Sequence, residues 1–298
     1  MTDTRCATQA RARRDPLAGT AAPARRWLLV EYPGPWAPLA LDSRQLPRET
    51  ADRLAEAARA ASARVLLIRR PGRRPRQPEH DWVVVDHTRG QHWGRWRDPL
   101  DLHEAAETLA ADPHPHGPQD DLLLVCAHGL HDTCCAVRGR PVAAALAARW
   151  PEATWECSHV GGDRFAANLL VVPDGACYGN LSPASACAVV EAHLSGVVTP
   201  DRLRGLSTEE PVVQAAIIEA HVRLGPGGAR DLAGSGLSAL SPNSWRVRLT
   251  GGGSMPAVVE ATVTRRRAPP ARLTCRALGD SAAYVYDVTD LQAVCAGG

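Results

Sequence analysis

The sequence contains no lysine, so the 34 side chains of fixed positive charge are all arginines. Against 32 acidic residues they leave a formal net charge of only +2. A protein that binds nucleic acid or an anionic membrane through its overall charge carries a much larger positive excess. Short arginine runs such as Arg265–Arg267 are typical of solvated surface. The composition therefore predicts neither nucleic acid nor a membrane as a partner.

The sequence also lacks any long apolar run. Its longest runs, NLLVV and DLLLV, have the length of a strand and fall far short of the ~20 residues that span a bilayer. The first 25 residues are basic and rich in small side chains, without the continuous apolar segment of a secretory signal. They predict a disordered leader over residues 1–25 and a soluble protein in the cytoplasm.

Cysteine, by contrast, is frequent, with nine residues in a chain of 298. The odd number, the length of the chain and the absence of an export signal argue against a disulfide scaffold. In a reducing cytoplasm, clustered cysteines more often indicate metal binding or redox chemistry.

Strand and helix patterns alternate after the leader, which predicts an α/β fold. Strands are expected in RWLLVEYPGPW, RVLLIRR, DWVVVDH and DDLLLVCAHG, and helices in RETADRLAEAARAASA, DPLDLHEAAETLAAD and SPASACAVVEAHLSG. A proline-rich break near residues 113–120 separates an N-terminal α/β half, residues 26–115, from a second half, residues 120–200. Residues 205–298 are expected to form a helix over 208–224 and a small β-rich extension, with strands in SWRVRLT, PAVVEATVT, ARLTCRA and AAYVYDVT.

Soft metal ligands are concentrated in the stretch CAHGLHDTCCAVRGRP. Cys126 ends a predicted strand, and Cys135 follows after eight residues of predicted loop, before a helix through RPVAAALAARW. A loop can turn both thiolates toward one point, and ligands in α/β proteins gather at such strand ends. The spacing favours a common ligand site for the two cysteines.

A second group of ligands lies in WECSHVGGD. Cys157 and His159 are two residues apart on a predicted strand, which places them on the same face. Asp163 follows a Gly-Gly turn that can fold it back toward that face. Thiolate, imidazole and carboxylate suit zinc or an iron–sulfur cluster, and the ligand types alone leave both open.

These two stretches, together with GACYGNL and RWLLVEYPGPW, resemble the sucrase/ferredoxin-like family of thioredoxin-like [2Fe-2S] ferredoxins. The resemblance runs from about Arg26 to about Leu181. It implies a thioredoxin-like second half and a [2Fe-2S] cluster held by two cysteines of the first loop and two histidines of an H-x-G-G-H motif. Cys126 and Cys135 match the cysteines, and His159 matches the first histidine.

The second histidine of that motif is replaced by Asp163 in this chain. Cys157 is the natural substitute, so the expected ligands are Cys126, Cys135, Cys157 and His159, with Asp163 as an alternative ligand or a partner of His159. A thiolate in place of an imidazole adds negative charge and is expected to lower the reduction potential.

The expected function is one-electron transfer to or from an unknown redox partner protein, as a carrier or a redox sensor rather than a stand-alone enzyme. One alternative is a thiol–disulfide or peroxide-type redox enzyme using Cys134 and Cys135, or a pair that includes Cys126, although the C-x-x-C spacing of thioredoxins is missing. Another is an interaction module with structural zinc. The family name also suggests sucrose hydrolysis, but no convincing pair of facing carboxylates can be nominated.

The other soft ligands are expected to be incidental. Cys134 is interpreted as a packed or partly exposed thiol, with a spare cluster ligand as the alternative. His128 and His131 are interpreted as solvated loop residues, with hydrogen bonding to cluster sulfides or proton relay as the alternative. The remaining cysteines have no partner at ligand spacing and are interpreted as small buried or incidental side chains; they are Cys6, Cys177, Cys187, Cys275 and Cys295.

Overall fold

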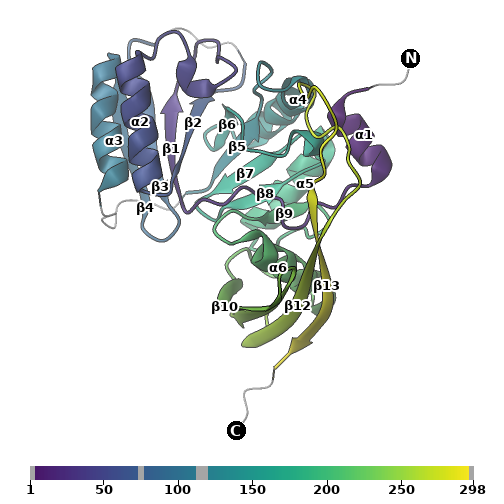
Figure 1. Ribbon diagram of the computed structural model, residues 1–298. Coiled ribbons are helices and arrows are strands. Elements are labelled where there is room, and N and C mark those ends of the chain that lie inside the picture. The colour runs from purple at the N-terminus through teal and green to yellow at the C-terminus, as the bar shows by residue number, and fades with distance from the viewer. Residues whose placement is uncertain (1–3, 73–76, 112–119, 295–298) are drawn as a thin grey trace.

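The computed structural model describes residues 4–72, 77–111 and 120–294. It is a mixed α/β fold with a nine-stranded sheet and a separate four-stranded antiparallel sheet, which confirms the predicted fold class (Figure 1). Most of the predicted break at 113–120, and Cys295, lie outside the described residues. Among these residues, no helix is both long and apolar enough to cross a membrane.

The first half follows the order strand, helix, parallel strand, antiparallel hairpin, helix. Its elements are β1 (Arg26–Glu31), α2 (Arg48–Ala60), β2 (Arg64–Arg69), β3 (His80–Asp86), β4 (Gly90–Trp96) and α3 (Leu102–Ala110). Their strands lie in the order β4-β3-β1-β2, with β1 and β2 parallel. The sequence predicts these elements except β4. This strand begins at Gly90, and Gly94 interrupts its sequence.

The second half repeats this connectivity without a sequence repeat. It consists of β5 (Leu122–Cys126), α4 (Thr133–Arg149), β6 (Thr154–Cys157), β7 (Leu169–Val172), β8 (Ala176–Tyr178) and α5 (Pro183–Leu194). Its strands lie in the order β6-β5-β7-β8, with β5 and β6 parallel, and β9 (Leu203–Leu206) extends the edge. The two halves therefore have the same strand order on either side of a common boundary.

That boundary is a short antiparallel pairing of β2 with β6, in which Ile68 lies opposite Cys157 and Arg69 opposite Glu156. A buried cluster spans it, with Trp27 and Leu29 from the first half and Leu124 and Cys126 from the second. Alternate residues of the same strands, such as Leu28, pack under the helices instead. Because strand side chains alternate between faces, each half has one helix-covered face and contributes the other to the shared core.

The C-terminal extension forms an antiparallel sheet of β10 (Leu232–Ser241), β11 (Ser244–Gly251), β12 (Val258–Arg267) and β13 (Tyr284–Ala293), and α6 (Pro211–Leu224) packs on it. The expected strand in ARLTCRA is wrong. Residues 268–283, which contain it, form a long connection that extends from the sheet to α1 and α4 (Figure 1). It is held there by polar contacts to the loop before α4, such as the hydrogen bond from Arg276 to the carbonyl of Leu130.

The expectation of disorder over residues 1–25 differs from the structure. Helix α1 (Cys6–Arg13) forms there and buries Cys6, Ala7 and Ala10. Its small side chains pack against Cys134 and Ala166 of the second half. The helix therefore owes its burial to tertiary contacts that the local sequence does not reveal.

Candidate metal-binding site

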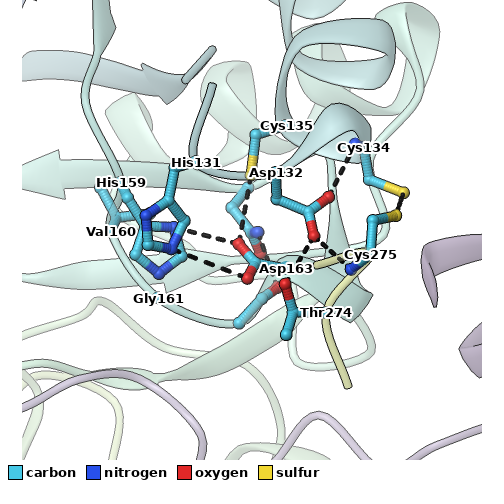
Figure 2. Close-up of polar contacts among 12 residues, drawn as sticks. His131, Asp132, Cys134, Cys135, His159, Val160, Gly161, Asp163, Thr274 and Cys275 are labelled. Atoms are coloured by element: carbon cyan, nitrogen blue, oxygen red, sulfur yellow. Dashed lines mark hydrogen bonds and ion pairs between the residues drawn. The ribbon is translucent and has the colours of Figure 1, made fainter. Parts of the chain in front are cut away.

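Helix α4 begins at Thr133, so Cys134 and Cys135 lie in its first turn rather than in the predicted loop. The start is fixed by Asp132, an extended N-cap residue whose carboxylate accepts a hydrogen bond from the Cys134 N–H at 2.7 Å. Aspartate is among the preferred N-cap residues, so the sequence DTCC carried this signal. The two cysteines point to different sides of the helix, Cys135 toward Asp163 and Cys134 toward Cys275 (Figure 2).

Gly139 allows α4 to lie close against the end of β5. A Cβ atom at this position would clash with the carbonyl oxygen of Cys126. The close approach brings Cys135 toward Cys126, whose thiol it contacts. The glycine of the sequence VRGRP is therefore required by packing around the site.

The second ligand segment turns sharply after β6, which ends at Cys157. Arg64 donates to the carbonyls of His159 and Val160, each at 3.0 Å. Gly161 and Gly162 have φ values of +95° and +75°, a left-handed conformation that favours glycine. This turn carries the chain back so that Asp163 faces His159.

Asp163 is the centre of the polar contacts in the site (Figure 2). Its Oδ1 accepts from Cys135 Sγ at 3.4 Å and lies 3.0 Å from Nδ1 of His159. Its Oδ2 lies 3.9 Å from Nε2 of His131. We call Cys126, Cys135, His159 and Asp163 the Cys126 site.

Charged forms of Cys126, His159 and Asp163 are favoured in the site, whereas the contact with Cys126, together with burial, raises the pKa of Cys135. Burial lowers the pKa of His159, but the contacts with Asp163 and Cys126 outweigh it and raise the pKa to about 9. The contact with Cys135, aided by His159, holds the pKa of Cys126 well below its ordinary value despite burial. Burial opposes ionisation of Asp163, yet the neighbouring His159 keeps its pKa lowered. Thiolate, carboxylate and neutral imidazole are the forms that bind metal ions, so a bound metal ion would displace protons from Cys135 and His159.

The structure brings together three of the four predicted ligands. Ligand atoms of Cys126, Cys135 and His159 lie within 4.8 Å of one another, and Cys157 does not belong to this group. Cys157 is fully buried in the core shared by the two halves. The expectation that Cys157 and His159 share a strand face is wrong, because β6 ends before His159. Asp163, the predicted alternative, occupies the position beside His159.

The histidines of the first loop pack against other residues, although they are expected from the sequence to be solvated. His128 is 2% exposed, packs edge-on against Trp36 and places Nε2 2.7 Å from the carbonyl oxygen of Ala37. His131 stacks on His159 with ring centroids 3.8 Å apart. His128 thus anchors the loop to the first half, and His131 covers the imidazole of the site.

Arg204 was not identified from the sequence. It is 1% exposed and donates to the carbonyl of Gly161 at 2.9 Å and to Asn168 Oδ1 at 3.0 Å. Asn168 in turn donates to the carbonyl of Gly162 at 2.9 Å, so Arg204 and Asn168 together fix the glycine turn. Arg204 lies on a strand far along the chain, and no local motif marks it. Arg164, which follows Asp163 directly, contacts Asp15 at 3.5 Å.

Comparison with protein families matches residues 17–205 to the sucrase/ferredoxin-like family. The match covers both halves of the large sheet and all residues of the Cys126 site. Comparisons with curated proteins and with solved structures found no match.

Proposed function

The chain belongs to the sucrase/ferredoxin-like family, and from this premise we propose that the Cys126 site binds a [2Fe-2S] cluster for one-electron transfer. The observation that carries the proposal is that ligand atoms of Cys126, Cys135 and His159 lie within 4.8 Å of one another, with the carboxylate of Asp163 in contact with Cys135 and His159. His159 fits this role because one of its ring nitrogens lies within 4.8 Å of both the Cys126 and the Cys135 sulfur. Thiolate and imidazole are established ligands of such clusters.

We assign Cys126, Cys135 and His159 as ligands and favour Asp163 over Cys157 as the fourth. Neither residue belongs to the group of ligand atoms formed by Cys126, Cys135 and His159, but Asp163 contacts both Cys135 and His159. The choice between them stays a prediction that separate variants can decide.

A [2Fe-2S] cluster supplies a one-electron couple when bound. The protein shields the thiol side, where Cys126 is 1% and Cys135 0% exposed. The side chains of His131 and His159 are 31% and 23% exposed, so they form the solvent-facing edge of the site. We expect the redox partner protein to approach over these two imidazoles.

A buried positive charge supports an anionic group in the site. The hydrogen bonds of Arg204 among the described residues go to neutral acceptors, namely carbonyls, a hydroxyl, an amide and the thiol of Cys177. Burying an arginine without a carboxylate partner is costly. The proposed cluster would have four protein ligands, three of them anionic. Their negative charge would lie on the other side of the glycine turn from Arg204 and would compensate its positive charge.

The test is anaerobic purification followed by visible absorption, EPR before and after dithionite, and iron, sulfide and zinc analysis. We expect two irons and two acid-labile sulfides per chain and an EPR signal on reduction. Cys126→Ser should lose iron, sulfide and visible absorption together, while Cys187→Ser, which changes a half-buried cysteine outside the site, should keep them.

Other results would favour the alternatives. Zinc lost in Cys126→Ser, with no iron in the parent protein, would support a structural zinc site. A metal-free protein whose Cys126 reacts rapidly with disulfides would support thiol–disulfide chemistry. A cytoplasmic location and the identity of the redox partner stay predictions.

A further inference from the structure

A second group of cysteines lies on the opposite side of the first turn of α4 from Cys135. The Sγ atoms of Cys6, Cys134 and Cys275 form a nearly equilateral triangle with sides of 3.7, 3.4 and 3.5 Å. These residues come from α1, from α4 and from the connection between β12 and β13. Cys6 and Cys134 are fully buried, and Cys275 is half-buried. We call these residues, with Asp132, the Cys134 cluster.

The carboxylate of Asp132 faces Cys134 and Cys275 (Figure 2) and also lies beside the thiol of Cys6. Its two oxygens lie 3.9 and 3.7 Å from Cys6 Sγ. One carboxylate oxygen lies within 4.8 Å of all three sulfurs. It is held by the N–H groups of Cys134 at 2.7 Å and Cys275 at 2.6 Å and by the hydroxyl of Thr274 at 2.8 Å. These three donors leave one of the roughly four lone-pair positions of the carboxylate free.

The triangle has the dimensions of a tetrahedral metal site. Sulfurs bound at ~2.3 Å to one tetrahedral zinc ion lie about 3.8 Å apart, close to the three observed separations. A disulfide bond could join only two of these cysteines and would leave the third thiol unbonded beside it. Thiolates are soft ligands that select zinc over magnesium or calcium.

We propose that Cys6, Cys134, Cys275 and Asp132 bind a Zn²⁺ ion. Three thiolates and one carboxylate oxygen complete four-coordination, as in closed structural zinc sites. The N–H of Cys6, which lies 3.5 Å from Cys275 Sγ, donates to a ligand sulfur and so supports the site from outside.

The ion would fasten α1 and the connection between β12 and β13 to α4. Cys6 is separated from Cys275 by 269 positions, and both meet at the first turn of the helix that also carries Cys135. The zinc site would therefore lie at the same helix terminus as the Cys126 site. It shares no ligand with the Cys126 site, so the two proposals can fail separately.

The experiment measures zinc and iron per chain in the full-length protein. We expect one zinc in the parent protein, lost in Cys6→Ser and in Cys275→Ser while iron and visible absorption persist. Cys187→Ser is the matched control and should retain both metals. Circular dichroism of each variant shows whether the fold is kept, and Asp132→Asn, which retains an oxygen acceptor at the helix cap, should weaken zinc binding by at least about tenfold.

Cobalt provides a second readout that does not depend on the variants' stability. After removal of zinc, Co²⁺ added to the parent protein should give the intense visible bands of tetrahedral thiolate coordination. Binding of neither Zn²⁺ nor Co²⁺ by the folded parent protein would overturn the proposal. Zinc that persists in Cys6→Ser and Cys275→Ser but disappears in Cys126→Ser would overturn it as well, by placing the ion in the Cys126 site.

Discussion

Nδ1 of His159 lies 3.0 Å from Oδ1 of Asp163, across the turn formed by Gly161 and Gly162. The motif that this chain resembles has a second histidine where Asp163 stands. The substitution keeps a metal ligand at that position but changes its charge, because a carboxylate is anionic and an imidazole neutral. The consequence concerns the reduction potential of the proposed cluster.

Asp163→His is expected to raise the reduction potential, on the order of 100 mV. A neutral ligand stabilises the oxidised form of the cluster less than an anionic ligand does. Redox titration of the parent and variant, followed by visible absorption, measures the difference. Cys157→Ser should leave the spectrum and potential unchanged. If Cys157→Ser instead bleaches the protein, Cys157 is the fourth ligand, and Cys157→His is then the variant expected to raise the potential.

Gly139→Ala is expected to destabilise the protein by about 1–3 kcal/mol and to lower its iron content. The added methyl group would meet the carbonyl of Cys126 and push α4 away from β5. Denaturant unfolding and iron analysis measure the two effects. Gly252→Ala is the matched control, because a Cβ there has nothing within 4 Å. Equal stability of the two variants would contradict the packing role of Gly139.

Arg204→Gln is expected to lower the free energy of unfolding by about 2–4 kcal/mol and to lower the potential of the proposed cluster. The variant removes hydrogen bonds to Gly161 and Asn168 and a positive charge that favours the reduced, more negative cluster. Thermal unfolding and redox titration check both effects. The control Arg223→Gln, which removes an exposed pair with Glu219, should cost less than about 1 kcal/mol. An unchanged potential would separate Arg204 from the electrostatics of the site.

Stability is expected to fall between pH 6.5 and pH 4 through His221. Burial lowers the pKa of this α6 residue to about 4, against the opposing effect of Asp231, and its Nδ1 accepts from the Gly227 N–H at 3.2 Å. In this range the unfolded chain takes up a proton that the folded chain excludes, so the free energy of unfolding rises with pH. The full effect is roughly 3 kcal/mol. Denaturant titrations of His221→Gln should show a flatter pH dependence, and an identical slope would exclude His221 as its source.

Local signals in the sequence predict much of the fold. The strand with Cys126, the serine-capped helix α5 and the antiparallel extension follow from apolar periodicity and capping residues. Cys126, Cys135 and His159 could likewise be found because they lie in short motifs next to strand ends. Cys157 was chosen for its period-two spacing, but that argument fails where the strand stops.

Other features depend on contacts between distant segments. Cys6 and Cys275 look isolated in the sequence, and only the packing of α1 and the connection between β12 and β13 brings them to Cys134. Arg204 reaches the glycine turn from a strand at the edge of the sheet. Hydrophobic periodicity describes one segment at a time, so it cannot predict contacts between residues that are distant in the sequence.

The contact between Cys6 and Cys275 also determines which of the two sites is completed first during synthesis of the chain. All residues of the Cys126 site have been made once the ribosome passes Asp163, whereas the Cys134 cluster requires the chain through Cys275. At roughly 5–20 residues per second, translation separates the two moments by several seconds or more. During that interval Cys6 and Cys134 lack their third thiol, and the residues of the Cys126 site are complete before α1 and the connection between β12 and β13 can meet.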